Sequence, residues 1–127
     1  LLDHIPALPE KIHYMPRLGG KYGDDVDAAA AGYAQELSAA FDGATPVFDV
    51  SILGIGEDAH VASLFPGRDE QFESATTVPV RNSPKPPPTR CTFTMPTIQS
   101  SREVWLIASG AGKAHAIKLA TSGLPAK

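Results

Sequence analysis

Cysteine is almost absent from this sequence, which has only Cys91 among its 127 residues. A single cysteine cannot form an intrachain disulfide, and this scarcity is typical of proteins in a reducing cytoplasm. The four histidines, at positions 4, 13, 60 and 115, lie far apart and form no zinc-binding spacing with the cysteine. We therefore expect a cytoplasmic protein without disulfides and without a metal site.

Long hydrophobic runs are also missing. No stretch approaches the roughly 18 apolar residues of a membrane-spanning helix, and no basic segment followed by an apolar run resembles a signal peptide. An excess of positive charge is missing too, because the formal net charge is −3. This balance argues against a general nucleic-acid binder. We expect neither a membrane nor a nucleic acid as a partner.

The charges are nonetheless distributed unevenly along the chain. Residues 1–63 carry a net charge of −7, whereas residues 64–127 carry +4. This difference is either ordinary surface variation or a sign that the second half supplies cations to a small anionic ligand. Charge patterning alone leaves both interpretations open.

Hydrophobic periodicity predicts alternating strands and helices. A helix is expected from Asp24 or Asp25 to about Phe41, with Gly43 as its stop. Strands are expected at 11–16, 47–54, 76–80, 90–96 and 103–109, with 47–54 and 103–109 buried. A short helix is expected at 60–65, and another after the glycine-rich turn at 110–112. This alternation predicts one α/β domain over residues 1–127 with a largely parallel sheet, in which ligands bind beyond the carboxyl ends of the strands.

The first candidate site is the stretch ILGIGEDAHVASLFPG, residues 52–67. It places Asp58 and His60 two positions apart, after Gly54 and Gly56. Histidine titrates near neutrality and suits acid–base work, and a nearby carboxylate can fix its tautomer. Because positions i and i+2 do not share a helix face, the pair needs a turn backbone, which the glycines permit. The alternative is a surface loop with incidental charges.

The same stretch matches the dinucleotide fingerprint G-x-G-x-x-G/A from Gly54 to Ala59. In that interpretation Glu57 and Asp58 would face a pyrophosphate at a helix N-terminus, where positive charge is needed. Pro66 would also cut the following helix short. The dinucleotide interpretation is therefore disfavoured.

Two cations in the second half are candidates for anion binding. Lys113 follows Gly110 and Gly112 at the start of a helix, where free backbone N–H groups and the helix dipole favour an anion. This turn lacks the first glycine and the Ser or Thr of a P-loop, so phosphate binding is favoured over phosphoryl transfer. Arg90 follows a proline-rich segment, and its guanidinium can fork onto phosphate oxygens. Taken alone, either residue could equally be a solvated surface cation.

Three motifs together resemble one known family. ILGIGEDAHVASLFPG, NSPKPPPTRCTFT and SGAGKAHAI, in this order, are similar to 6-phosphogluconolactonases, whose superfamily includes glucosamine-6-phosphate isomerase/deaminase. The match covers nearly all 127 residues, and LFPG and the PKPPP-R segment favour the lactonase branch. The resemblance implies a Rossmann-like three-layer α/β sandwich with a mostly parallel sheet. It also implies that no nucleotide, metal or other cofactor is needed.

The resemblance assigns roles to individual residues. His60 matches the family's proposed general base, and Asp58 matches the aspartate two positions before it. Arg90 and Lys113 match the family's phosphate contacts. Ala59 stands where the family has glycine, and a left-handed backbone there would strain alanine by about 1 kcal/mol or more.

The family's pattern is longer than this sequence. Its first glycine-rich phosphate loop, its aspartate-glutamate-arginine segment and its continuation beyond position 127 do not occur here. We expect a fragment that lacks the N-terminal part and the extreme C-terminus of the family's fold.

The expected reaction is hydrolysis of 6-phospho-D-glucono-1,5-lactone to 6-phosphogluconate in the oxidative pentose phosphate pathway. His60 would activate water, and backbone amides near Gly54 and Gly56 would donate to the oxyanion. Ser63 lacks the G-x-S-x-G elbow of a serine nucleophile, so direct water attack is favoured. The alternatives are an isomerase/deaminase acting on glucosamine 6-phosphate and a non-catalytic sugar-phosphate-binding regulatory domain. A monomer is favoured.

Overall fold

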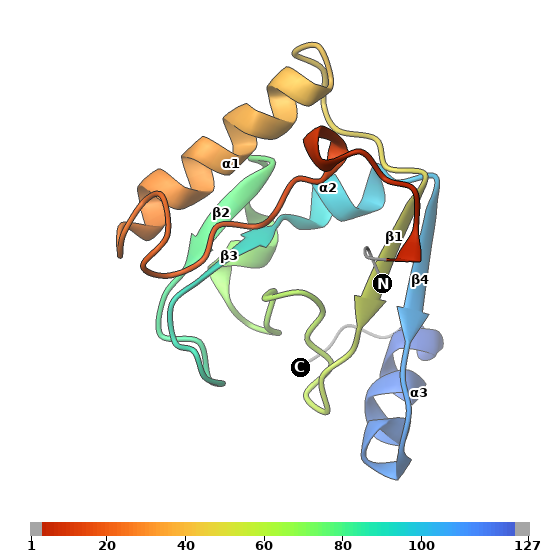
Figure 1. Ribbon diagram of the computed structural model, residues 1–127. Helices are drawn as coiled ribbons and strands as arrows, with labels where there is room; N and C mark the ends of the chain where they lie inside the picture. Colours follow the sequence, from red (N-terminus) through yellow and green to blue (C-terminus); the bar gives the residue numbers. More distant parts are fainter. Residues whose placement is uncertain (1–3, 124–127) are drawn as a thin grey trace.

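The computed structural model describes residues 4–123 of the chain. Two strand pairs, three α-helices and three short 3-10 helices make up the regular structure of residues 4–123, and Figure 1 shows one pair beneath α1 and α3 below the ends of the other. In chain order the elements are η2 (Pro9–Lys11), α1 (Val26–Ala40), β1 (Val50–Gly54), η3 (Asp69–Phe72), β2 (Thr77–Val80), β3 (Arg90–Phe93), α2 (Met95–Gln99), β4 (Glu103–Ile107), η4 (Ala111–Lys113) and α3 (Ala114–Ser122).

The predicted first helix is confirmed as α1. The Asp25 carboxylate accepts a hydrogen bond of 3.0 Å from the N–H of Ala28, so Asp25 rather than Asp24 is the N-cap. An alanine-rich sequence favours the helix intrinsically. Its buried face holds Ala30, Tyr33 and Leu37 at helical spacing.

The helix α1 packs on an antiparallel pair formed by β2 and β3. The hydroxyl of Thr77 on β2 donates to the carbonyl of Ala30 at 2.7 Å, and the rings of Tyr33 and Phe93 lie 5.9 Å apart. Val80, also on β2, is fully buried. Among residues 4–123, this helix-on-sheet layer holds about half of the buried apolar side chains.

The second pair, β1 and β4, is parallel, with Gly54 opposite Ile107 at its carboxyl end. Within residues 4–123 the main packing partner of each of these strands is the other strand. Ile52 and Ile107 are therefore 59% and 58% exposed. The strands are confirmed, but the prediction that both are buried is wrong, because long apolar runs indicate covered strands only where other elements pack on them.

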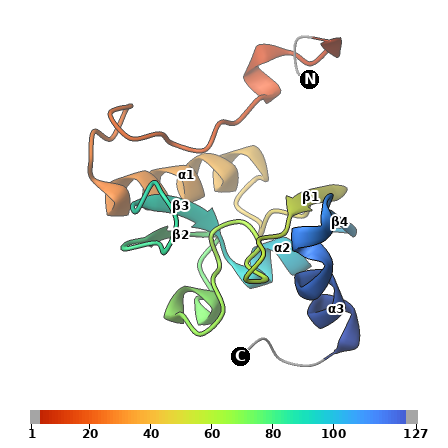
Figure 2. The ribbon, with the colours of Figure 1, turned by 90° about the horizontal axis from the view of Figure 1, so that it is seen from below.

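Two predicted segments do not form. Residues 11–16 make no strand ladder; instead the hydroxyl of Tyr33 donates to the carbonyl of His13 at 3.1 Å. This segment leads back to η2, which lies away from the sheets in Figure 2. Residues 60–65 make turns rather than a helix, because Ala62 has a left-handed φ of 50° and Val61 pairs with Leu64.

The α/β class is confirmed, and its parallel pair places two loops together. Because β1 and β4 run in the same direction, the turn after Gly54 and the turn before α3 emerge at one end of the sheet (Figure 1). No helix among residues 4–123 has the length and apolar character needed to cross a membrane.

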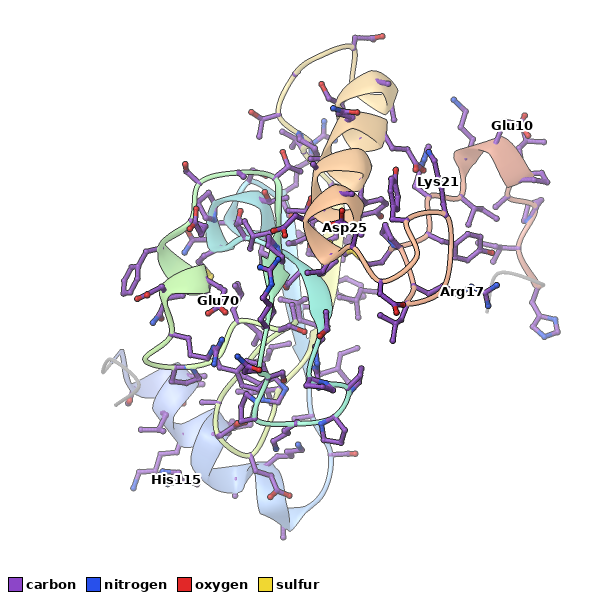
Figure 3. The ribbon with its side chains drawn as sticks, turned by 90° about the vertical axis from the view of Figure 1, so that its left-hand side faces the viewer. Glu10, Arg17, Lys21, Asp25, Glu70 and His115 are labelled. Atoms are coloured by element: carbon purple, nitrogen blue, oxygen red, sulfur yellow. The ribbon has the colours of Figure 1, made fainter. Side chains whose placement is uncertain are left out.

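The cap on α1 yields a stability prediction. Asp25→Ala should lower the free energy of unfolding by about 1 kcal/mol, because it leaves the N–H of Ala28 without its side-chain acceptor. The matched control is Asp24→Ala, which removes the same charge one residue earlier and should change stability by less than about 0.5 kcal/mol. Figure 3 labels Asp25 at the start of the helix. Urea denaturation of both variants measures the difference, and equal losses would contradict the assigned cap.

Candidate active site

The loop that follows β1 is a tight hairpin closed by backbone hydrogen bonds. The N–H of Gly56 donates to the carbonyl of His60 at 2.8 Å, and the N–H of Ala59 donates to the carbonyl of Gly56 at 3.0 Å. Ile55 and Val61 pair across its base. A three-residue hairpin loop of this kind ends in a left-handed residue, and Ala59 has that conformation with φ of 66°.

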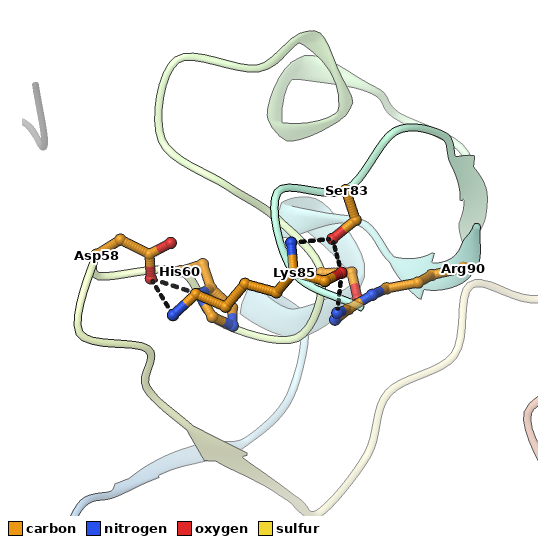
Figure 4. A network of polar contacts seen from close by, with 6 residues as sticks. Asp58, His60, Ser83, Lys85 and Arg90 are labelled. Atoms are coloured by element: carbon orange, nitrogen blue, oxygen red, sulfur yellow. Dashed lines mark hydrogen bonds and ion pairs between the residues drawn. The ribbon is translucent and has the colours of Figure 1, made fainter. Parts of the chain in front are cut away.

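This loop brings Asp58 and His60 into direct contact, as the sequence predicts. The imidazole Nδ1 lies 2.6 Å from Oδ1 of the carboxylate (Figure 4). An ionised carboxylate can only accept hydrogen bonds, so Nδ1 carries the proton and Nε2 keeps its lone pair. The pair thus prepares Nε2 to accept a proton, which is the requirement for a general base.

The electrostatic surroundings keep Asp58 ionised. Burial raises the pKa of the Asp58 carboxyl, but the hydrogen bond with His60 and the positive charge of Lys85 outweigh burial, so that the pKa lies below its ordinary value. The carboxylate is therefore charged throughout the neutral range and can stabilise an imidazolium as it forms.

Gly56 is needed for space rather than for conformation. A Cβ built on Gly56 would collide with the His60 ring and with Oδ1 of Asp58, and Gly56 has no left-handed φ. Gly54 differs, because a Cβ there would meet no atom within 4 Å. The two glycines of the G-x-G sequence therefore have different roles. Of the two, only Gly56 leaves room for the acid–base pair to lie against the backbone.

A cavity of about 490 Å³ opens beside this pair. It is lined by His60, by the end of β1 and by two lysines, Lys85 and Lys113. Its volume lies within the range of small-molecule sites. A cavity of about 530 Å³ near Tyr14 is similar in size, and Glu36 on its wall lies 2.8 Å from Nδ1 of His13, but the His13 imidazole is not among its lining residues. The chemistry therefore points to the cavity at His60.

Lys113 reaches this cavity from the turn before α3, as the sequence predicts. A Cβ built on Gly112 would lie only 2.7 Å from Oε1 of Glu57, so the Glu57 carboxylate lies against the same turn. This approach could not be predicted from the sequence, because the two segments are far apart along the chain. An anion at Lys113 would therefore have a carboxylate nearby.

Arg90 lies behind the cavity rather than on its wall. Its guanidinium carbon lies 5.8 Å from the centroid of the Phe65 ring. The centroid of that ring lies 4.4 Å from that of the His60 ring, with the two planes tilted by 31°. The guanidinium also donates to Ser63 at 3.3 Å. Further bonds of 2.8 to 2.9 Å run to carbonyl oxygens of the proline-rich segment, those of Lys85, Pro86 and Pro87. These bonds use most of its five N–H groups.

Lys85 is the site residue that sequence reasoning missed. Its ammonium lies 3.9 Å from Oδ1 of Asp58 and lines the same cavity as His60. In the sequence it is one lysine within a proline-rich connector, and its only signal is its position shortly before Arg90.

Other chemistry finds little support in the described residues. No helix begins at Ala59, so the dinucleotide fingerprint lacks the N-terminus that it requires. Among residues 4–123 no three histidine, cysteine or acidic side chains are grouped as metal ligands. Burial raises the pKa of Cys91 to about 11, so this thiol stays protonated near neutral pH and is a poor nucleophile.

Comparison with known proteins agrees with this geometry. The family model described as "Glucosamine-6-phosphate isomerases/6-phosphogluconolactonase" matches residues 1–127. The chain belongs to this family. The predicted resemblance is thereby confirmed.

Several similar proteins are named 6-phosphogluconolactonase. That of Streptomyces coelicolor is 51% identical over 97% of this chain and 49% of its own length, and that of Mycobacterium leprae is 50% identical over 98% and 52%. The solved 6-phosphogluconolactonase of Trypanosoma cruzi is 28% identical with a TM-score of 0.72, over 82% of this chain and 43% of its own. The chain thus spans about half the length of the curated relatives it matches.

The crowding at Gly56 yields a prediction about the acid–base pair. Gly56→Ala should separate His60 from Asp58, because its Cβ would occupy the space that both side chains use. The measurement is the proton NMR signal of the Nδ1–H, which should move upfield or vanish. Gly54→Ala is the matched control, since its Cβ meets open space, and it should keep the signal. An unchanged signal in Gly56→Ala would contradict the close approach.

The left-handed backbone at Ala59 yields a prediction of opposite sign. Ala59→Gly should raise the free energy of unfolding by about 0.5–1 kcal/mol, because glycine adopts positive φ without strain. Ala31→Gly, in the exposed part of α1, should instead lower it by about 1 kcal/mol. Thermal denaturation of the two variants checks the opposite signs, and destabilisation by Ala59→Gly would refute the strain at this position.

Proposed function

We propose that the chain is the catalytic part of a 6-phosphogluconolactonase, which hydrolyses 6-phospho-D-glucono-1,5-lactone to 6-phosphogluconate in the oxidative pentose phosphate pathway of the cytoplasm. The observation that carries this proposal is the His60–Asp58 pair at a cavity that Lys113 also lines. A base and a phosphate-binding cation at one cavity are what a phosphorylated lactone requires. The names of the relatives support the same reaction.

In the proposed mechanism, Nε2 of His60 takes a proton from a water molecule, whose oxygen forms a bond to the lactone carbonyl carbon. Asp58 stabilises the imidazolium through Nδ1–H. The tetrahedral oxyanion then collapses, the bond from the carbonyl carbon to the ring oxygen breaks, and the imidazolium returns its proton to that oxygen. The products are a hydroxyl group and a carboxylic acid, which releases a proton to solvent. A positioned base of this kind contributes roughly 10²–10⁴-fold.

The phosphate aligns the carbonyl at the base, so that binding energy remote from the reaction lowers its barrier. Lys113 holds this phosphate from the turn before α3. Arg90 can join it only through the small part of its guanidinium that the proline-rich segment leaves unused. Of the two proposed oxyanion donors, Gly56 already donates to His60 within the loop. Gly54, the other candidate, lies opposite Ile107 at the end of the β1–β4 ladder.

Two other functions fit the same family or fold. An isomerase/deaminase would release ammonia from glucosamine 6-phosphate, and a regulatory domain would bind 6-phosphogluconate without hydrolysing the lactone. We favour the lactonase because the relatives of about 50% identity are named for that activity. Parallel assays with the lactone and with glucosamine 6-phosphate distinguish the three.

The role of His60 yields a prediction about activity. His60→Ala should lower kcat/KM for lactone hydrolysis at least about 100-fold, because the proton acceptor is lost. His115→Ala is the matched control, since His115 lies on the exposed side of α3 (Figure 3) and should retain activity. Acid release at constant pH measures the rate after subtraction of spontaneous hydrolysis. Full activity in His60→Ala would reject the general-base role.

A further inference from the structure

Two positively polarised groups share one oxygen of Asp58. The imidazole Nδ1 lies 2.6 Å from Oδ1, and the ammonium of Lys85 lies 3.9 Å from the same atom (Figure 4). The first distance is that of a strong charge-assisted hydrogen bond, whereas the second is at the outer limit of an ion pair. Asp58 is therefore bound firmly to His60 and loosely to Lys85.

The backbone of Lys85 is fixed even though its ammonium is loosely held. Its carbonyl accepts hydrogen bonds from Arg90 at 2.8 Å and from the hydroxyl of Ser83 at 2.9 Å, and its N–H donates to that hydroxyl at 3.3 Å. Ser83 is itself buried and joined to Pro88 through its N–H. The backbone of Lys85 is thereby fixed, and from it the side chain reaches Asp58 in the loop that carries the acid–base pair.

The side chain of Lys85 can move at small cost. It is 43% exposed, and its ammonium makes no hydrogen bond among the described residues, so only a loose ion pair holds it. It lines the cavity together with His60 and Lys113. An anionic group that enters this cavity would therefore meet Lys85 as an available cation.

We infer that Lys85 couples anion binding to the basicity of His60, and this inference rests on the proposed use of the cavity for a phosphorylated substrate. Without ligand, Lys85 partly neutralises the Asp58 carboxylate and disfavours an imidazolium beside it. When an anion binds, the ammonium turns toward that anion and leaves the carboxylate to His60. The base thus becomes stronger when substrate is present. Lys85 is a positioning residue in this scheme, because it acts on the proton transfer through Asp58.

The other charges around His60 do not perform this coupling. Lys113 reaches the cavity from the turn before α3, where Glu57 lies nearby. Arg90 acts from behind Phe65 and is bonded to backbone carbonyls. Among the cations of residues 4–123, only Lys85 contacts the carboxylate that His60 uses and also lines the cavity that an anion would enter.

The test is a pH titration of the four histidines by NMR, with the His60 resonances assigned from His60→Gln. Sulfate serves as the probe because it stays dianionic over the titration range. Without sulfate, Lys85→Met should raise the midpoint of the His60 titration by about 0.5 pH unit, which is typical of removing one nearby charge in a solvent-exposed setting. With saturating sulfate, the His60 midpoint should rise in both proteins, but less in the variant.

The matched control is Lys118→Met, which removes an equal charge from the exposed side of α3 and should leave the His60 midpoint unchanged. Lys85→Met should also bind sulfate roughly tenfold more weakly than the unmodified protein. Equal His60 midpoints in Lys85→Met and the unmodified protein, or an equal response to sulfate, would overturn the inference. These readouts need no turnover, so the coupling can fail while the lactonase assignment stands, and the reverse also holds.

Discussion

The hydrogen bond between His60 and Asp58 is the constraint on which the rest of the site depends. It fixes which imidazole nitrogen carries the proton, and it requires a backbone that turns within three residues. The chain meets this requirement with a left-handed residue at Ala59 and with a residue that lacks a side chain at Gly56. The left-handed backbone at Ala59 is strained, but it orients the His60 base before substrate arrives.

The cations reach this pair from later in the chain because of the parallel pairing of β1 and β4. Two strands that run in the same direction deliver the His60 loop and the Lys113 turn to the same end of the sheet. The antiparallel β2–β3 pair contributes differently, since Arg90 at the start of β3 holds the proline-rich segment and so places Lys85. Lys85 and Lys113, from the basic second half of the chain, therefore line the same cavity as His60, from the acidic first half.

Local features of both fold and site were predictable from the sequence. The helix α1, the strands β1 to β4 and the pairing of Asp58 with His60 follow from residues close together in the chain, whereas the strand expected at 11–16 did not form. Lys85 was missed because its contact with Asp58 depends on the path of a proline segment that Arg90 fixes. The exposure of Ile52 and Ile107 was missed because an apolar run does not reveal what packs on it. The helix expected at 60–65 does not form, because the left-handed φ of Ala62 is incompatible with a right-handed α-helix.

The most direct test of the central claim is to determine the tautomer of His60 when its imidazole is uncharged, from the nitrogen-15 chemical shifts of the ring. The geometry predicts a protonated Nδ1, hydrogen-bonded to Asp58, and an unprotonated Nε2 available to accept a proton from water. At a pH above the midpoint of the His60 titration, a predominant Nε2–H tautomer would contradict this account, because the nitrogen proposed as the base would already hold a proton.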